Sequence, residues 1–154
     1  MLTADERREI EAALGKFPGR KAGCLEALRV IQERRGWVSD EAVRDVAAAV
    51  GLSPDELDGV ATFYNMIFRK PVGRHVILIC DSISCWVTGY GGILDRLRSR
   101  LGIGVGETTA DSRFTVLPVC CLGACDRAPA VMVDNDLYVD VTPDGLEAML
   151  EKYP

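Results

Sequence analysis

Ten residues in the middle of the chain read Val76-Ile77-Leu78-Ile79-Cys80-Asp81-Ser82-Ile83-Ser84-Cys85. The first four are aliphatic without interruption, which is typical of a strand buried on both faces of a sheet. The strand ends at Cys80, and four residues separate this thiol from Cys85. The run therefore predicts a strand whose end presents two sulfur atoms.

A second pair of cysteines, Cys121 and Cys125, has three residues between its members and follows the apolar segment 114–119. The residues between the pairs include apolar side chains at helical spacing, namely Ile93, Leu94, Leu97 and Leu101. Strand, helix and strand in this order predict two parallel strands joined by a right-handed crossover. Because the carboxyl ends of parallel strands share one edge of a sheet, we expect folding to bring Cys80 and Cys121 together.

The residues that follow predict an antiparallel hairpin and a closing helix. Apolar segments at 130–133 and 137–139 flank a turn at 134–136, and Thr142-Pro143 is a helix-opening signal. The order β-α-β followed by β-β-α is that of a thioredoxin-like domain, so the predicted fold class is α/β.

The part of the chain before these strands predicts short helices packed as a small bundle. Serine and threonine caps open the predicted helices and glycines close them, at Thr3, Ser39, Ser53, Gly36 and Gly51. The segment 69–74, Arg-Lys-Pro-Val-Gly-Arg, breaks this pattern. We therefore expect a helical bundle domain at residues 1–70 and a thioredoxin-like domain at residues 71–154.

Composition excludes several classes of function. The net charge is −5 and the isoelectric point is near 4.9, whereas nucleic-acid binding needs a basic surface. No apolar run approaches the roughly 20 residues of a membrane span, and the charged N-terminal residues are unlike a secretory signal. We expect a protein without direct membrane insertion, in a compartment where thiols stay reduced. There, six cysteines indicate metal or redox chemistry more than a disulfide framework.

Four converging thiolates are a ligand set for iron or zinc. Structural zinc usually takes cysteines with two residues between them, and neither pair has this spacing. Two separated pairs suit a two-iron cluster, with Cys80 and Cys85 on one iron and Cys121 and Cys125 on the other. The spacing favours an iron–sulfur cluster, while zinc and a thiol or disulfide function stay open as alternatives.

The other cysteines and the histidine are weaker candidates for a functional site. Only one of the neighbours Cys120 and Cys121 can face a cluster, because consecutive side chains on an extended chain point to opposite sides. Cys24 lies on the inward face of its helix and is expected to be core. The single histidine, His75, cannot make a Rieske site, which needs two.

No catalytic residue, dinucleotide motif or flavin motif is evident. The glycines of segment 102–106 follow a predicted helix and lack the spacing of a nucleotide-binding turn. Trp37, Phe63, Tyr64 and Phe68 are expected in the core or in a subunit contact.

Several motifs resemble one known family, the E subunit of bacterial NADH–quinone oxidoreductase, the 24-kDa subunit of respiratory complex I. They are Cys80-Asp81-Ser82-Ile83-Ser84-Cys85 with Gly89, Gly106-Glu107-Thr108-Thr109, Arg113-Phe114-Thr115, Cys121-Leu122-Gly123-Ala124-Cys125 with Ala128-Pro129, Gly36-Trp37-Val38, and Gly59-Val60-Ala61-Thr62-Phe63-Tyr64. The resemblance covers nearly the whole chain. The family's Cys-Leu-Gly-x-Cys pattern selects Cys121 as the ligand, which leaves Cys120 as a buried apolar thiol.

The resemblance implies a [2Fe–2S] cluster on Cys80, Cys85, Cys121 and Cys125. It also implies a partner, the F subunit of 51-kDa type, which binds FMN and NADH on the cytoplasmic side of the inner membrane. The cluster then accepts or holds single electrons from that flavin. Soluble NAD-linked hydrogenases and formate dehydrogenases use similar subunits and are the alternative setting; a zinc-stabilised interaction domain is a further one.

Overall fold

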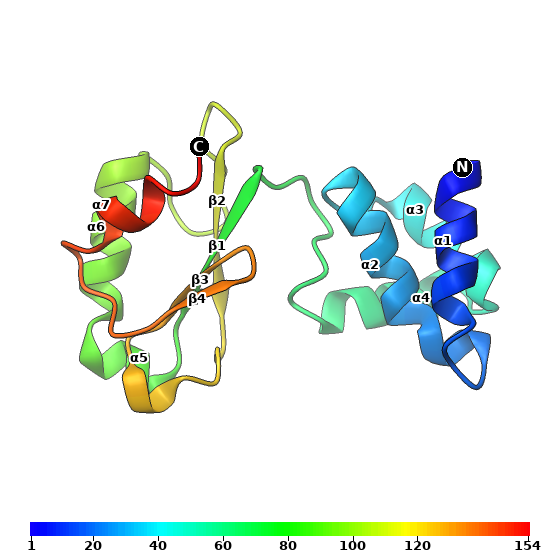
Figure 1. Ribbon diagram of the computed structural model, residues 1–154, viewed down its shortest axis with the longest axis horizontal. Coiled ribbons are helices and arrows are strands. Elements are labelled where there is room, and N and C mark those ends of the chain that lie inside the picture. The colour runs from blue at the N-terminus through cyan, green and yellow to red at the C-terminus, as the bar shows by residue number, and fades with distance from the viewer. The chain divides into compact units, whose positions relative to one another are not determined.

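The computed structural model describes residues 1–154, which form two compact units, Met1–Pro71 and Val72–Pro154. The first unit is helical, and the second combines a four-stranded sheet with helices (Figure 1). The fold class is therefore α/β with a preceding helical part, as predicted. None of the helices has the length and apolar character needed to cross a membrane.

The first unit has four α-helices and a short 3₁₀ helix. They are α1 (Ala4–Leu14), η1 (Arg20–Gly23), α2 (Cys24–Arg35), α3 (Asp40–Val50) and α4 (Pro54–Phe63). The side chains of Thr3, Ser39 and Ser53 accept backbone N–H groups at the starts of α1, α3 and α4. Gly36 and Gly51 end α2 and α3 in the left-handed conformation that favours glycine. The predicted helix starts and ends are confirmed.

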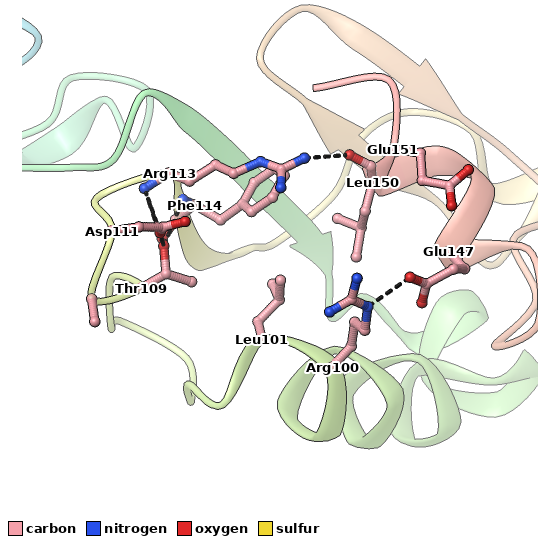
Figure 2. Close-up of a pocket in the computed structure, with 10 residues that line it drawn as sticks. Arg100, Leu101, Thr109, Asp111, Arg113, Phe114, Glu147, Leu150 and Glu151 are labelled. Carbon is pink, nitrogen blue, oxygen red and sulfur yellow. Dashed lines mark hydrogen bonds and ion pairs between the residues drawn. The ribbon is translucent and has the colours of Figure 1, made fainter. Parts of the chain in front are cut away.

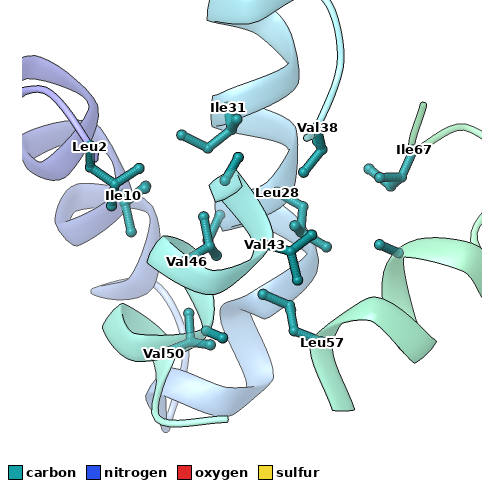
Figure 3. Close-up of a cluster of buried hydrophobic side chains, with 14 of the residues drawn as sticks. Leu2, Ile10, Leu28, Ile31, Val38, Val43, Val46, Val50, Leu57 and Ile67 are labelled. Carbon is teal, nitrogen blue, oxygen red and sulfur yellow. The ribbon is translucent and has the colours of Figure 1, made fainter. Parts of the chain in front are cut away.

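Aliphatic side chains from all four helices meet in the core of the first unit (Figure 3). Leu28 and Ile31 of α2 pack with Val46 of α3 and Leu57 of α4, and all four are fully buried. Full burial of a side chain of this size is favourable by roughly 1.5–3 kcal/mol. Because the helices are short, this packing contributes more to their stability than intrinsic helix propensity does.

One carboxylate, that of Glu6, is buried within this helical unit. Its two oxygens accept hydrogen bonds from Arg35 Nε and Nη2 at 2.6 and 2.7 Å, and the second also accepts the Thr3 N–H at 2.7 Å. The Arg35 hydrogen bonds lower the pKa of Glu6 from its ordinary 4.5 to about 2, although burial acts in the opposite direction. Glu6 therefore joins the start of α1 to the end of α2 while ionised.

We expect the stability of the helical unit to depend on pH through Glu6. Its folded pKa lies below the unfolded value, so the stabilisation is complete above pH 4.5 and is lost as the pH falls toward about 2. Glu6→Gln should lower the free energy of unfolding at neutral pH by up to about 3 kcal/mol and should flatten this dependence. Urea unfolding followed by far-UV circular dichroism at several acidic pH values measures both effects.

Glu9→Gln is the matched control, because Glu9 also pairs with an arginine, Arg34, but its side chain is 45% exposed. An exposed pair contributes about 0–1 kcal/mol. Identical pH profiles for the wild type and Glu6→Gln would contradict the assignment to Glu6.

The second unit is built around one sheet. Its elements are β1 (His75–Cys80), α5 (Ile83–Thr88), α6 (Tyr90–Leu101), β2 (Phe114–Val119), η2 (Cys125–Arg127), β3 (Val131–Val133), β4 (Asp136–Tyr138) and α7 (Leu146–Leu150). The strand order is β2-β1-β3-β4, with β1 parallel to β2 and antiparallel to β3. This is the predicted β-α-β unit followed by an antiparallel hairpin and a closing helix.

Helices α6 and α7 lie together on one face of the sheet (Figure 1). Ile93 and Leu97 of α6 and Leu146 of α7 pack with Ile77 and Ile79 of β1 in the buried core. The two edge strands differ in length. Strand β4 has three residues, and β2 has six with Pro118 near its end.

Two local predictions differ from the structure. No helix was predicted next to Cys85, but Ile83 and Ser84 form the start of α5, which runs for six residues from Ile83 to Thr88. The closing helix begins at Leu146, because the N–H of Gly145 bonds to both the side-chain and carbonyl oxygens of Thr142 and forms a turn first. Of the aromatic residues expected in the core or in a subunit contact, Phe63 is 80% exposed and Tyr64 45% exposed, so neither is core.

The entry into β1 is held by a buried threonine. Thr115 Oγ1 accepts the backbone N–H of Gly73 at 2.6 Å and lies 2.7 Å from the hydroxyl of Thr108. A Cβ at Gly73 would stand 3.0 Å from backbone atoms of Arg113 and Phe114, so the backbones approach as closely as glycine permits. This contact fixes where β1 starts alongside β2.

Thr115→Val should destabilise the second unit by about 1–3 kcal/mol, because it leaves the buried N–H of Gly73 without an acceptor. Denaturant unfolding measures this change. Thr142→Val is the control within the same unit, since the Thr142 hydroxyl accepts an N–H at an exposed position. Equal stability of the wild type and Thr115→Val would show that this hydrogen bond does not hold the start of β1.

Candidate metal centre

The two cysteine pairs lie at the carboxyl ends of the two parallel strands. Cys80 is the last residue of β1 and is paired in register with Val119, the last residue of β2. The N–H of Asp81 donates to the carbonyl of Val119 at 3.0 Å and so continues the pairing past the end of the strand. Cys121 lies two residues after Val119. Folding therefore places Cys80 and Cys121 at the same end of the sheet, as predicted.

The first pair is buried. Cys80 is 2% and Cys85 is 1% exposed. Cys85 lies in the first turn of α5, and the N–H of Gly89 donates to its carbonyl at the end of that helix. The helix thus turns the Cys85 side chain back toward the end of β1, where the Cys80 side chain is its neighbour.

The second pair is exposed and closely spaced. The sulfur atoms of Cys121 and Cys125 are 3.6 Å apart, and the N–H of Gly123 points at Cys121 Sγ from 3.3 Å. Gly123 has φ +78°, a left-handed conformation that lets the chain turn back within three residues. Two thiolates on one tetrahedral metal, with bonds of about 2.3 Å, stand about 3.8 Å apart. The pair therefore fits two ligands of a single iron.

Interactions between the pairs run through Cys80 and the start of α5. Cys80 lies close enough to Cys85 and Cys121 to influence the pKa of both thiols, and Cys85 is likewise influenced by Cys125. Figure 1 shows α5 and η2, which begins at Cys125, side by side at this end of the sheet. No three His, Cys, Asp or Glu side chains converge tightly enough to hold one metal ion. A two-iron cluster needs no such convergence, since each iron takes two of the four thiolates.

The thiols differ in how readily they ionise. The Gly123 N–H lowers the pKa of Cys121, and hydrogen bonds from neighbouring side chains, including Ser82, act in the same direction. Cys125 shares a hydrogen bond with Cys121, which raises the pKa of Cys125. Burial raises the pKa of the Cys85 thiol, an effect that a hydrogen bond from the Ala130 backbone opposes. Hydrogen-bond donors around sulfur of this kind stabilise an anionic cluster.

The small residues Gly123 and Ala124 leave room for a backbone donor near Cys121, and the Gly123 N–H lies 3.3 Å from the Cys121 sulfur. The roles of Ser82 and Ala130 were not predicted. A serine between two ligand cysteines is a signal that sequence reasoning could have used. The approach of Ala130 depends on the hairpin pairing with β1 and has no local signal.

Two other cysteines lie outside the site. Cys120 was expected to be a buried apolar thiol, but its side chain is exposed. Val119 is the last paired residue of β2, and its side chain points into the core. The Cys120 side chain points to the opposite side and lies past the end of the strand pairing. Cys24 is half-buried and packs against the helical core, close to its predicted position.

An open hollow of about 360 Å³ lies at the opposite end of β2, where that strand begins at Phe114 (Figure 2). Its two arginines are already engaged. Arg100 Nε donates to Glu147 at 2.6 Å, and Arg113 donates to the backbone carbonyls of Leu150 and Tyr153. No cysteine lines it. The hollow is therefore separate from the cysteine site.

Comparison with known proteins agrees with this geometry. A family model described as thioredoxin-like [2Fe–2S] ferredoxin matches residues 10–154. The E subunit of NADH-quinone oxidoreductase from Pseudomonas aeruginosa is 47% identical over 153 residues, which are 99% of this chain and 92% of that protein. Its counterpart from Escherichia coli is 46% identical over 152 residues, with the same two coverages.

Among solved structures, an NAD+-reducing [NiFe]-hydrogenase in the air-oxidised state matches with a TM-score of 0.71 and 27% sequence identity. The match covers 85% of this chain and 22% of that much longer chain.

The chain therefore belongs to the thioredoxin-like [2Fe–2S] ferredoxin family. Within that family its relatives define the particular group, the E subunits of NADH–quinone oxidoreductase.

The adjacent cysteines allow a direct test of the ligand set. Cys121→Ser should abolish a stable cluster, because it removes the sulfur that faces Cys125 at 3.6 Å. Cys120→Ala should leave the cluster intact, because the Cys120 side chain points into solvent. Visible absorption and the iron and sulfide content of each purified variant measure the outcome. The reverse pattern would overturn the choice of Cys121.

Proposed function

We propose that the chain is the electron-transfer subunit of NADH–quinone oxidoreductase and that it holds one [2Fe–2S] cluster on Cys80, Cys85, Cys121 and Cys125. The observation that best supports this function is that both cysteine pairs lie at the carboxyl ends of two parallel strands. Cys80 and Cys85 would bind one iron, and Cys121 and Cys125 the other. The bound cluster supplies reversible one-electron chemistry.

The chain's own residues do the rest of the work. The sheet core under β1 and β2 holds the ligand loops in place, and the Gly123 N–H favours negative charge on Cys121. Burial of Cys80 and Cys85 keeps water from one side of the site, while Cys121 and Cys125 are exposed, which leaves that side open to a redox partner. In this proposal the function of these residues is to hold an electron carrier at a defined place.

In this proposal the chain works inside a larger complex. The partner is the F subunit of 51-kDa type, which binds FMN and NADH, and the assembly is peripheral to the inner membrane on its cytoplasmic side. Residues 71–154 form the cluster-binding domain, and residues 1–70 form a helical domain that supports assembly. The relatives named as E subunits support this setting.

A second candidate setting is an NAD-linked hydrogenase. The solved hydrogenase supports it, with 27% sequence identity and a TM-score of 0.71. The E subunits are more similar, at 46–47% identity over 99% of the chain, so NADH–quinone oxidoreductase is the preferred setting. A zinc-stabilised interaction domain has less support, because the family model is that of a [2Fe–2S] ferredoxin.

The full-length protein, purified without oxygen, should be coloured and should contain about two irons and two acid-labile sulfides per chain. Chemical reduction should add one electron, seen as a paramagnetic signal. A colourless protein with zinc in place of iron would contradict electron transfer. Affinity capture from the native cells should recover a flavoprotein that oxidises NADH. Recovery of a nickel protein with it would instead support the hydrogenase setting.

A further inference from the structure

The two cysteine pairs differ sharply in access from solvent. Cys80 and Cys85 are 2% and 1% exposed, whereas Cys121 and Cys125 are both exposed. The exposed sulfurs are also only 3.6 Å apart. Before a cluster is inserted, molecules in solution can therefore reach one pair of thiols and not the other.

The loop between the exposed cysteines is already closed. Gly123 turns the chain back at φ +78°, and the N–H of Arg127 donates to the carbonyl of Ala124 to form the short helix after it. The Arg127 side chain is paired with Asp140, whose N–H donates to the carbonyl of Arg127 at 2.8 Å. A disulfide bond needs the two sulfurs about 2.05 Å apart. The change from 3.6 Å is within reach of side-chain rotation and a small loop shift.

We propose that Cys121 and Cys125 form an oxidisable dithiol in the cluster-free chain, with a low-molecular-weight disulfide such as glutathione disulfide as the co-reactant. One thiolate of the pair attacks a glutathione sulfur, a mixed disulfide forms, and the first glutathione thiolate leaves. The second thiolate then attacks the protein sulfur of that mixed disulfide and expels the second glutathione. Two electrons pass from the protein to glutathione disulfide, and the two protons of the protein thiols end on the two glutathione thiols.

The other thiols compete poorly for this reaction. Cys80 and Cys85 are buried, and Cys24 is half-buried in the helical unit. Cys120 is exposed, but its Cα is only about 3.8 Å from that of Cys121, whereas disulfides usually span 4.4–6.8 Å. Cys120 is therefore a poor disulfide partner for Cys121. The Cys125 sulfur lies 3.6 Å from that of Cys121, so we expect the internal disulfide to join these two residues.

Oxidation of the pair has a consequence for cluster loading. A disulfide between Cys121 and Cys125 withdraws both thiolates proposed for one iron, so the oxidised chain should accept no cluster until a dithiol reduces it. This consequence rests on the ligand assignment of the proposed function. The disulfide itself rests only on the geometry of the two exposed thiols.

The test uses the full-length chain, freed of metal, fully reduced, and equilibrated with mixtures of glutathione and glutathione disulfide. After alkylation of the remaining thiols, peptide mass spectrometry should find a disulfide that joins Cys121 to Cys125 within one chain. In the Cys125→Ser variant the reaction should stop at a mixed disulfide of Cys121 with glutathione. The Cys120→Ser variant should still form the disulfide between Cys121 and Cys125. A disulfide that maps to Cys80 or Cys120, or an exposed pair that stays reduced while Cys120 is modified, would overturn the proposal.

Cluster reconstitution of the oxidised and re-reduced chain separates this inference from the proposed function. Loss of cluster binding on oxidation and its recovery with dithiothreitol support both. A Cys121–Cys125 disulfide that leaves cluster loading unchanged supports the dithiol and overturns the ligand assignment. A chain that binds its cluster through these residues but forms no disulfide overturns the dithiol alone.

Discussion

Parallel pairing of β1 with β2 is the constraint on which the candidate site depends. The register puts Cys80 opposite Val119, and one backbone hydrogen bond beyond it, from Asp81 to the Val119 carbonyl, carries the pairing past the strand ends. A shift of this register would separate the two ligand loops along the sheet. The buried contact between Gly73 and Thr115 therefore bears on the site, although it lies at the opposite end of the two strands.

Each ligand pair is held by a different kind of local structure. Cys85 is carried by the short helix Ile83–Thr88, and the N–H of Gly89 at the end of this helix donates to the Cys85 carbonyl. Cys121 and Cys125 lie on a tight loop, and the ion pair of Arg127 with Asp140 ties the far side of that loop to the segment after β4. The first pair is thereby enclosed and the second is presented at the surface.

Much of this arrangement could be predicted because its signals are local or periodic. The uninterrupted aliphatic run of β1, the helical spacing in α6 and the capping residues of the first unit all describe the chain within a few neighbouring residues. Helix α5 was missed because six residues are too few to show a helical period. The start of α7 was placed too early, because Thr142, which was expected to open the helix, instead accepts the Gly145 N–H in a turn before it.

Other features depend on contacts between distant residues and have no local pattern. The exposure of Cys120 follows from the point at which the pairing of β1 and β2 ends. No single stretch of the sequence indicates that point. The approach of Ala130 to Cys85 requires the hairpin to be docked on β1. The bond of Glu6 to Arg35 joins residues 29 positions apart, so neither residue alone indicates that the carboxylate is buried.

The two edges of the sheet also bear on how the protein behaves at high concentration. An open edge can recruit a strand from another molecule and begin aggregation, and long flat edges are the most hazardous. Strand β4 offers only three residues, and exposed Pro118 on β2 has no N–H for an incoming strand. Proline on an edge strand and a short edge strand are both protective. The same sheet that positions the sulfur ligands is therefore a poor template for growth into fibrils.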